Sequence, residues 1–126
     1  MGRNVSFGRH GKDWQADRKH AKDHELTFDK GSEDSITFYI GTPAGRFTFN
    51  EEDPIWVKID DDGECPKKPC SHPDIRVESC HGPRLVVHNA NQEKARLRYQ
   101  LNVYDREEKE WCPIDPIMNN GGKGLS

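Results

Sequence analysis

The sequence lacks any long hydrophobic run, and no apolar stretch approaches the ~18 residues of a membrane-spanning helix. It does not open with a basic segment followed by an apolar one, so no secretory signal is expected. It also lacks a Gly-x-x-x-x-Gly-Lys phosphate loop, a G-x-S-x-G elbow and an H-E-x-x-H helix. We therefore expect a cytoplasmic protein without membrane contacts, and the sequence favours a non-enzymatic role.

The chain has few apolar residues, and they are unevenly distributed. It is 126 residues long, with 32% hydrophobic residues, 33% charged residues and a formal net charge of -3, which indicates one domain. Residues 1–24 carry six basic and three acidic side chains and only six apolar ones. We predict that they form a flexible or partly helical charged arm, because so few apolar residues cannot form a core.

From Leu26 onward, apolar residues alternate with polar ones, which is the period of a β-strand. The clearest case is 95–103, where Leu97, Tyr99 and Leu101 alternate with arginine and glutamine. Its Glu, Lys, Ala, Arg and Leu residues favour a helix by propensity, but the period favours a strand. Similar runs at 26–28, 36–41, 46–50, 55–59, 75–78 and 84–89 bring the expected total to seven or eight strands.

Turn residues separate these runs, and no connection has room for a crossover helix. Pro43 and Gly45 predict a hairpin between 36–41 and 46–50. The pattern predicts an all-β fold, namely a single antiparallel β-sandwich of the immunoglobulin-like type over 25–118. The glycine-rich residues 119–126 are predicted to form a flexible tail.

The C-terminal part contains RLVVHNAN (84–91), RLRYQLNVYD (96–105) and CPIDPIMNNGG (112–122). These segments, and above all the I-D-P-x-I-x-N ending, resemble a family of small bacterial proteins with no assigned function. The resemblance extends over roughly 35–120 and implies a bacterial, non-enzymatic, immunoglobulin-like sandwich. It brings no catalytic residues, because none is assigned to the pattern.

The four cysteines leave several interpretations open. They could be free thiols or form two disulfides, although disulfides are rare in a reducing compartment. Alternatively, Cys65, Cys70, His72 and Cys80 could bind zinc, which takes four sulfur or nitrogen ligands. A thiol enzyme built on Cys80 is a third alternative. No cofactor other than a possible zinc ion is expected.

The aromatic residues suggest contact with another protein. Trp14 lies in the charged arm, and Trp56 is out of phase with its apolar neighbours Ile55 and Val57. Tryptophan is enriched among the residues that contribute most to protein–protein binding. Because acidic residues are interspersed through the arm and the body is acidic, no nucleic-acid partner is expected. The sequence therefore predicts a non-catalytic interaction module that binds a protein partner or self-associates through the N-terminal arm and the sandwich surface, with Trp14 and Trp56 as the contact residues.

Overall fold

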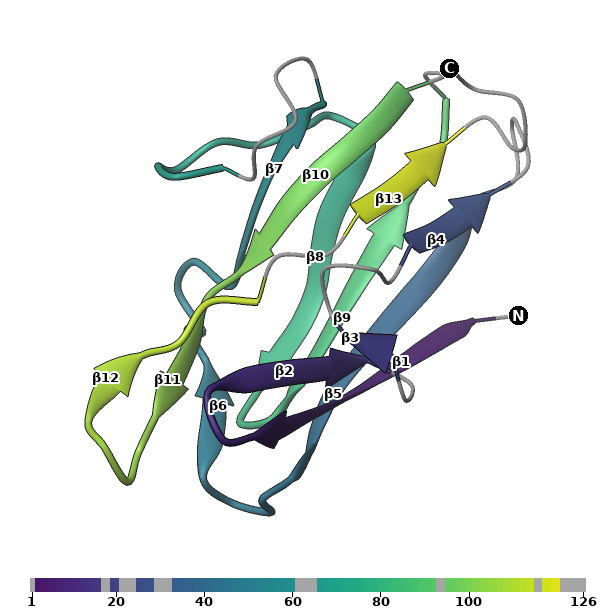
Figure 1. Cartoon of the computed structure of the whole chain (residues 1–126). Helices are drawn as coiled ribbons and strands as arrows, with labels where there is room; N and C mark the ends of the chain where they lie inside the picture. Colours follow the sequence, from purple (N-terminus) through teal and green to yellow (C-terminus); the bar gives the residue numbers. More distant parts are fainter. Residues whose placement is uncertain are drawn as a thin grey trace.

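The computed structural model describes residues 2–16, 19–20, 25–28, 33–60, 66–92, 95–114 and 117–120. In these residues the chain forms thirteen strands and no helix (Figure 1). The all-β prediction is therefore confirmed. The strands are more numerous than the seven or eight expected, because the N-terminal residues also form strands and because Asn102 divides the long alternating run into two.

The largest sheet, called the large sheet below, has the strand order β3-β2-β1-β5-β9-β8. Its strands are β3 (Lys19–His20), β2 (Asp13–Ala16), β1 (Arg3–His10), β5 (Asp34–Thr42), β9 (Arg84–Asn89) and β8 (Ile75–His81). Strand β8 lies at one edge and carries a bulge between Val77 and Ser79.

The second sheet has the order β4-β13-β10-β7, and the small sheet has the order β12-β11-β6. Their strands are β4 (Glu25–Phe28), β13 (Ile117–Asn120), β10 (Ala95–Leu101), β7 (Ile55–Ile59), β12 (Glu110–Trp111), β11 (Val103–Asp105) and β6 (Phe47–Phe49). The small sheet continues the second one, because a bridge joins Leu101 to Ile114 and only Asn102 separates β10 from β11. Since β13 extends to Asn120, the predicted tail of 119–126 begins too early; residues 121–126 lie outside the described residues.

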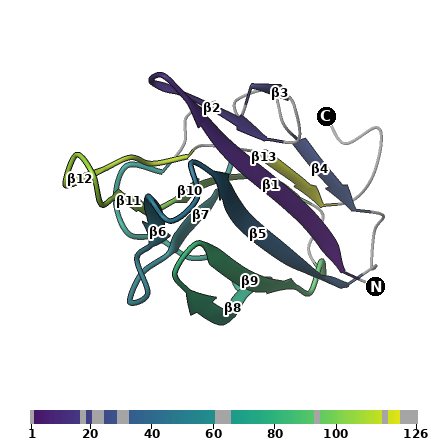
Figure 2. The same cartoon turned by 90° about the horizontal axis from the view of Figure 1, so that it is seen from below.

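The large sheet faces the other two across one hydrophobic core. Figure 2 shows β1, β5, β9 and β8 along one side of the molecule. Phe38 of β5 contacts Tyr99 of β10 with ring centroids 5.7 Å apart. Leu97, Tyr99 and Leu101 are all fully buried, as the alternation in this segment predicts. Strand period therefore outweighs the helix propensity of these residues, because only a strand places all three in the core.

The predicted N-terminal arm is wrong for Arg3–His10 and Asp13–Ala16, which are strands of the large sheet. The two strands form a hairpin in which His10 is opposite Asp13, and the turn contains Gly11 with φ at +64°, a conformation that glycine adopts readily. The buried residues of this hairpin are Val5, Phe7, Trp14 and Ala16. Few apolar residues suffice here, because they alternate and complete a core that the rest of the chain supplies.

Two further expectations about strand pairing are wrong. The sheets are mixed rather than purely antiparallel, because β1 is parallel to β5 and β4 is parallel to β13. The strands at 36–41 and 46–50 do not form a hairpin, because β5 lies in the large sheet and β6 pairs with β11. The turn at Pro43–Arg46 instead carries the chain from one sheet to the other.

Candidate functional site

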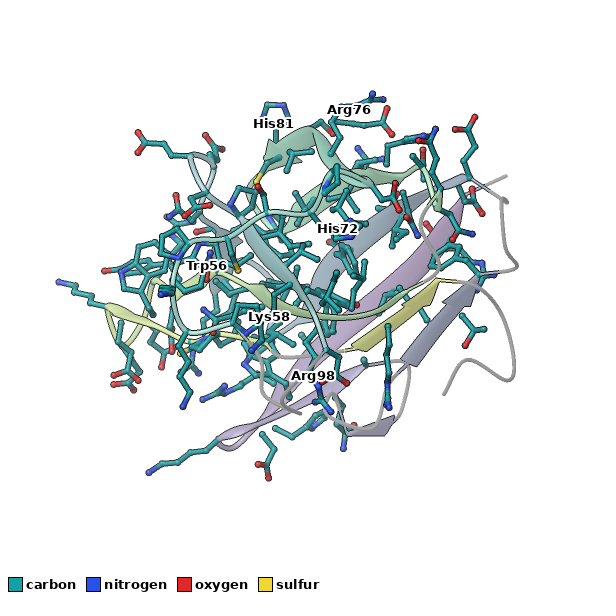
Figure 3. All side chains as sticks on the ribbon, turned by 90° about the horizontal axis from the view of Figure 1, so that it is seen from above. Trp56, Lys58, His72, Arg76, His81 and Arg98 are labelled. Atoms are coloured by element: carbon teal, nitrogen blue, oxygen red, sulfur yellow. The ribbon has the colours of Figure 1, made fainter. Side chains whose placement is uncertain are left out.

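Trp56 lies on β7 with its side chain on the outer side of the second sheet. Val57 beside it is buried, whereas Trp56 is half-buried and lies opposite Gln100 of β10. Its indole Nε1 donates a hydrogen bond of 2.7 Å to the Asp53 carboxylate. Figure 3 shows Trp56 at one end of a row that continues with Lys58 and Arg98. The out-of-phase position expected from the sequence therefore places this tryptophan at the surface.

Asn102 fixes the surroundings of Trp56. Its side-chain amide donates to the Asp53 carbonyl at 2.8 Å and accepts from the Gln100 amide at 2.8 Å. Its backbone N–H donates to the Pro54 carbonyl, and its carbonyl accepts from the Asn50 N–H. Asn102 is 8% exposed, so these bonds hold the 50–54 segment in a single arrangement against the strands.

A cavity opens beside Trp56 and Asn102, and we call it the tryptophan cavity. Its volume is about 360 Å³, which is within the range of small-ligand sites. The lining residues are Asn50, Trp56, Gln100, Asn102, Val103, Trp111 and Pro113. Two indoles and three carboxamides thus meet at one place from separate segments of the chain.

Trp111 is the most exposed large apolar residue of the described chain. Its side chain is 57% exposed, and it packs edge-on against Tyr104 with ring centroids 5.0 Å apart. Trp111 cannot be selected from alternation in the sequence, because β12 has only two residues and shows none. A signal was present, since Trp111 follows a run of charged residues that predicts exposure.

Acidic residues adjoin two of the lining residues along the chain. Glu51 and Glu52 follow Asn50 and are exposed, and Glu110 precedes Trp111 and is also exposed. The lining residues of the described chain include no charged side chain of either sign.

The second predicted contact residue, Trp14, is buried and is not available as a surface contact. It is 6% exposed and packs edge-on against Phe47 of β6, with ring centroids 4.9 Å apart. The Arg9 guanidinium lies 5.0 Å from the centre of its ring. Trp14 therefore joins the large sheet to the small sheet.

The candidate zinc ligands are only partly described. Cys65 lies outside the described residues. Cys70 is half-buried in the segment beside β7, where its carbonyl accepts from the Val57 N–H. His72 is buried and accepts from the Asp74 N–H through Nδ1, whereas Cys80 lies on β8 near the Asn50 carbonyl. In the described residues no group of three or more His, Cys, Asp or Glu side chains could hold a metal ion.

Two thiols have raised pKa values. Burial, with a smaller effect from Glu51, raises the pKa of Cys80 to about 11. Burial also raises the pKa of the Cys112 thiol. Both groups are therefore protonated at neutral pH, and a protonated thiol is a poor nucleophile. Cys70, Cys80 and Cys112 carry free thiols.

Comparison with known protein families and with curated proteins finds no match to this chain. Among the described residues there is no helix that could cross a membrane.

Proposed function

We propose that this protein is a non-catalytic binding module on an immunoglobulin-like sandwich, and that it recognises a protein partner, or a second copy of itself, through the tryptophan cavity. The observation that carries the proposal is the cavity between Trp56 and the exposed Trp111. The bacterial origin implied by the sequence resemblance is part of the same proposal.

The strand order supports the immunoglobulin-like part of the proposal. In that fold, strands A, B, E and D form one sheet and strands C, F and G form the other. With β5 as strand B, the neighbours β5-β9-β8 correspond to B-E-D, and β7-β10-β13 correspond to C-F-G. Strand β1 then takes the position of strand A beside β5, although it runs parallel to β5.

The chemistry of the cavity supports binding to a protein. A half-buried tryptophan and an exposed one in a hollow lined by polar groups are typical of residues that anchor a partner. Asp53 and Asn102 hold the surroundings of Trp56 in place before any partner arrives, so binding orders few side chains.

The absence of a catalytic group in the lining supports the non-catalytic part of the proposal. The cavity residues of the described chain include no serine, cysteine, histidine, lysine or carboxylate, and these are the groups that act as nucleophiles or as general acids and bases. Cys80, the candidate nucleophile, is half-buried and has a raised pKa.

Loss of association on truncating the two tryptophans tests the proposal. Sedimentation equilibrium of the purified chain measures self-association, and cross-linking to proteins of the source organism, followed by purification of the captured species, supplies a partner. We expect Trp56→Ala and Trp111→Ala each to weaken the complex by about tenfold or more. Tyr39→Ala is the matched control, because Tyr39 is an exposed aromatic residue (45%) on β5 of the large sheet. Complexes that keep full affinity in both tryptophan variants would refute the proposal.

A further inference from the structure

We infer that the tryptophan cavity takes a proline-bearing, extended segment of the partner protein. This inference names the chemistry of the partner and rests on the function proposed above. It follows from three properties of the lining: it carries no charge, it contains two indole rings, and its side chains offer more unused hydrogen-bond donors than acceptors.

The lining favours an uncharged ligand. None of the lining side chains in the described chain carries a charge. A charged ligand group would therefore lose its hydration in the cavity without gaining an opposite charge from the lining. The groups that fit are neutral ones, either apolar or able to form hydrogen bonds.

The two indoles offer surfaces for an aliphatic ring. Trp56 and Trp111 line the same hollow from β7 and β12, and a hydrogen bond of 2.7 Å to the Asp53 carboxylate holds Trp56 in place. The face of an indole is broad, apolar and slightly negative, so it packs well against C–H groups such as those of a proline ring. Hollows lined by aromatic side chains are a recurring binding site for extended proline segments.

The orientation of each carboxamide in the lining follows from its partner. The Asp53 carbonyl can only accept, so Asn102 donates to it through Nδ2 and accepts from Gln100 Nε2 through Oδ1. Asn50 accepts the backbone N–H of Glu52 through Oδ1 at 3.1 Å. The side-chain oxygens of Asn50 and Asn102 are therefore both engaged as acceptors.

The groups that remain are mainly donors. Among the described residues, Asn50 Nδ2 and Trp111 Nε1 have no hydrogen-bond partner, and Gln100 and Asn102 each keep a second N–H. In the described part of the lining, Gln100 Oε1 is the only side-chain oxygen that accepts no hydrogen bond. The matching ligand offers acceptors and few donors. A proline residue does so, because it has a carbonyl group and no N–H, whereas a sugar hydroxyl both donates and accepts.

An extended proline segment also suits the size and the rigidity of the site. A cavity volume of about 360 Å³ is at the lower end of ligand sites, which fits a short stretch of chain better than a large ligand. A polyproline II segment has no internal hydrogen bonds and is already extended before it binds. Since the bonds of Asp53 and Asn102 also hold the surroundings of Trp56, neither side needs much ordering.

The test follows the indole N–H signals of the full chain by nuclear magnetic resonance during titration with neutral peptides. Three peptides of equal length are rich in proline, in N-methylglycine or in alanine. The chain has three tryptophans, and the buried Trp14 is the internal reference. We expect the proline peptide to shift the signals of Trp56 and Trp111 and to leave that of Trp14 unchanged.

The other two peptides separate the ring of proline from its missing N–H. The N-methylglycine peptide also lacks N–H groups but has no ring, so it should bind about threefold more weakly than the proline peptide. The alanine peptide lacks the ring and carries N–H groups that find few acceptors in the lining. It should bind about tenfold more weakly or less.

Two substitutions test the donors of the lining. Trp111→Phe keeps an aromatic ring but removes its N–H, and Asn50→Asp keeps the acceptor for the Glu52 N–H but removes the side-chain donors. Each should weaken binding of the proline peptide by about threefold or more. Asn4→Asp is the matched control, because Asn4 is exposed on β1 of the large sheet. This variant should bind as the original chain does, and circular dichroism confirms that every variant is folded.

Equal binding of the three peptides would overturn the preference for proline and leave the proposed function standing. The same would hold if no peptide bound while Trp56→Ala and Trp111→Ala still lost the association described above. Proline-peptide binding that neither Trp111→Phe nor Asn50→Asp changes would also overturn the inference. Shifts of the Trp56 and Trp111 signals by maltose, with none by the peptides, would overturn both the inference and the proposed binding to a protein.

Discussion

Arg46 and Asp105 form a two-point ion pair across two segments that are 59 residues apart. The Arg46 Nε donates to Oδ1 at 2.9 Å and its terminal nitrogen donates to Oδ2 at 2.8 Å. The same carboxylate accepts the backbone N–H groups of Glu107 and Glu108. Asp105 therefore fixes the turn between β11 and β12 and also anchors the start of β6.

This pair predicts a loss of stability in acid. Hydrogen bonds from Arg46 hold the pKa of the Asp105 carboxyl well below its usual range. A lowered folded-state pKa stabilises the fold above the unfolded value of about 4, and this contribution is lost as the pH falls below it. Asp105→Asn should therefore be less stable than the original chain near neutral pH, and the difference should shrink in acid.

Urea unfolding across this pH range measures the difference. Glu107→Gln serves as the control, because its carboxylate is 68% exposed and lies 3.7 Å from Arg46. The control should change stability little at any pH. A difference between Asp105→Asn and the original chain that is the same in acid and at neutral pH would contradict the assignment.

Trp14→Ala should destabilise the fold by about 3–5 kcal/mol, because it empties a buried site between the large and small sheets. Trp111→Ala is the matched tryptophan variant at an exposed site, and it should cost less than about 1 kcal/mol. Chemical denaturation monitored by circular dichroism measures both. Similar losses in the two variants would show that Trp14 is not part of the core.

Asn102→Ala should cost about 1–3 kcal/mol, because the half-buried Asp53 carbonyl loses its donor and the Gln100 amide loses its acceptor. Gln100→Ala removes only the second of these bonds and should cost less. Thermal unfolding compares the two, and Trp56 fluorescence reports whether the 50–54 segment has shifted. A larger loss in Gln100→Ala would contradict the central role of Asn102.

Cys80 should react slowly with iodoacetamide at neutral pH, and its rate should rise until the pH approaches its pKa of about 11. A free cysteine, with a pKa of about 8.5, reaches its maximum rate at a lower pH. Because Glu51 contributes to the raised pKa, Glu51→Gln should increase the neutral rate, whereas Glu52→Gln should not. Peptide mapping by mass spectrometry follows each cysteine. Fast labelling of Cys80 at neutral pH would contradict this prediction and favour a thiol enzyme.

The sequence predicts most strands of the two facing layers, because alternation reports directly which residues point inward. It fails for the N-terminus, although Val5 and Phe7 alternate, as do Trp14 and Ala16. Their charged neighbours suggest an exposed arm, and local composition does not show that a distant strand, β5, will pair with β1. The parallel pairings of β1 with β5 and of β4 with β13 cannot be predicted from local composition for the same reason.

Only part of the candidate site can be predicted from the sequence. Trp56 can be selected because its phase differs from that of Ile55 and Val57. Its relation to Trp111 and Asn102 depends on how β7, β11 and β12 come together, and no local pattern encodes that arrangement. Trp14 and Trp56 look alike in the sequence, but the register of the sheets buries Trp14 and leaves Trp56 half-buried on the outer side of the second sheet.

The parallel pairing of β4 with β13 has a consequence for the newly made chain. Glu25 is opposite Ile117, so a strand from the first quarter of the sequence needs a partner that leaves the ribosome much later. Until β13 has been synthesised, Leu26 and Phe28 lack this partner strand, although both are buried in the folded protein. Pairing over such a distance is slow, and exposed apolar strands aggregate. We therefore expect the nascent chain to need a chaperone until β13 has emerged.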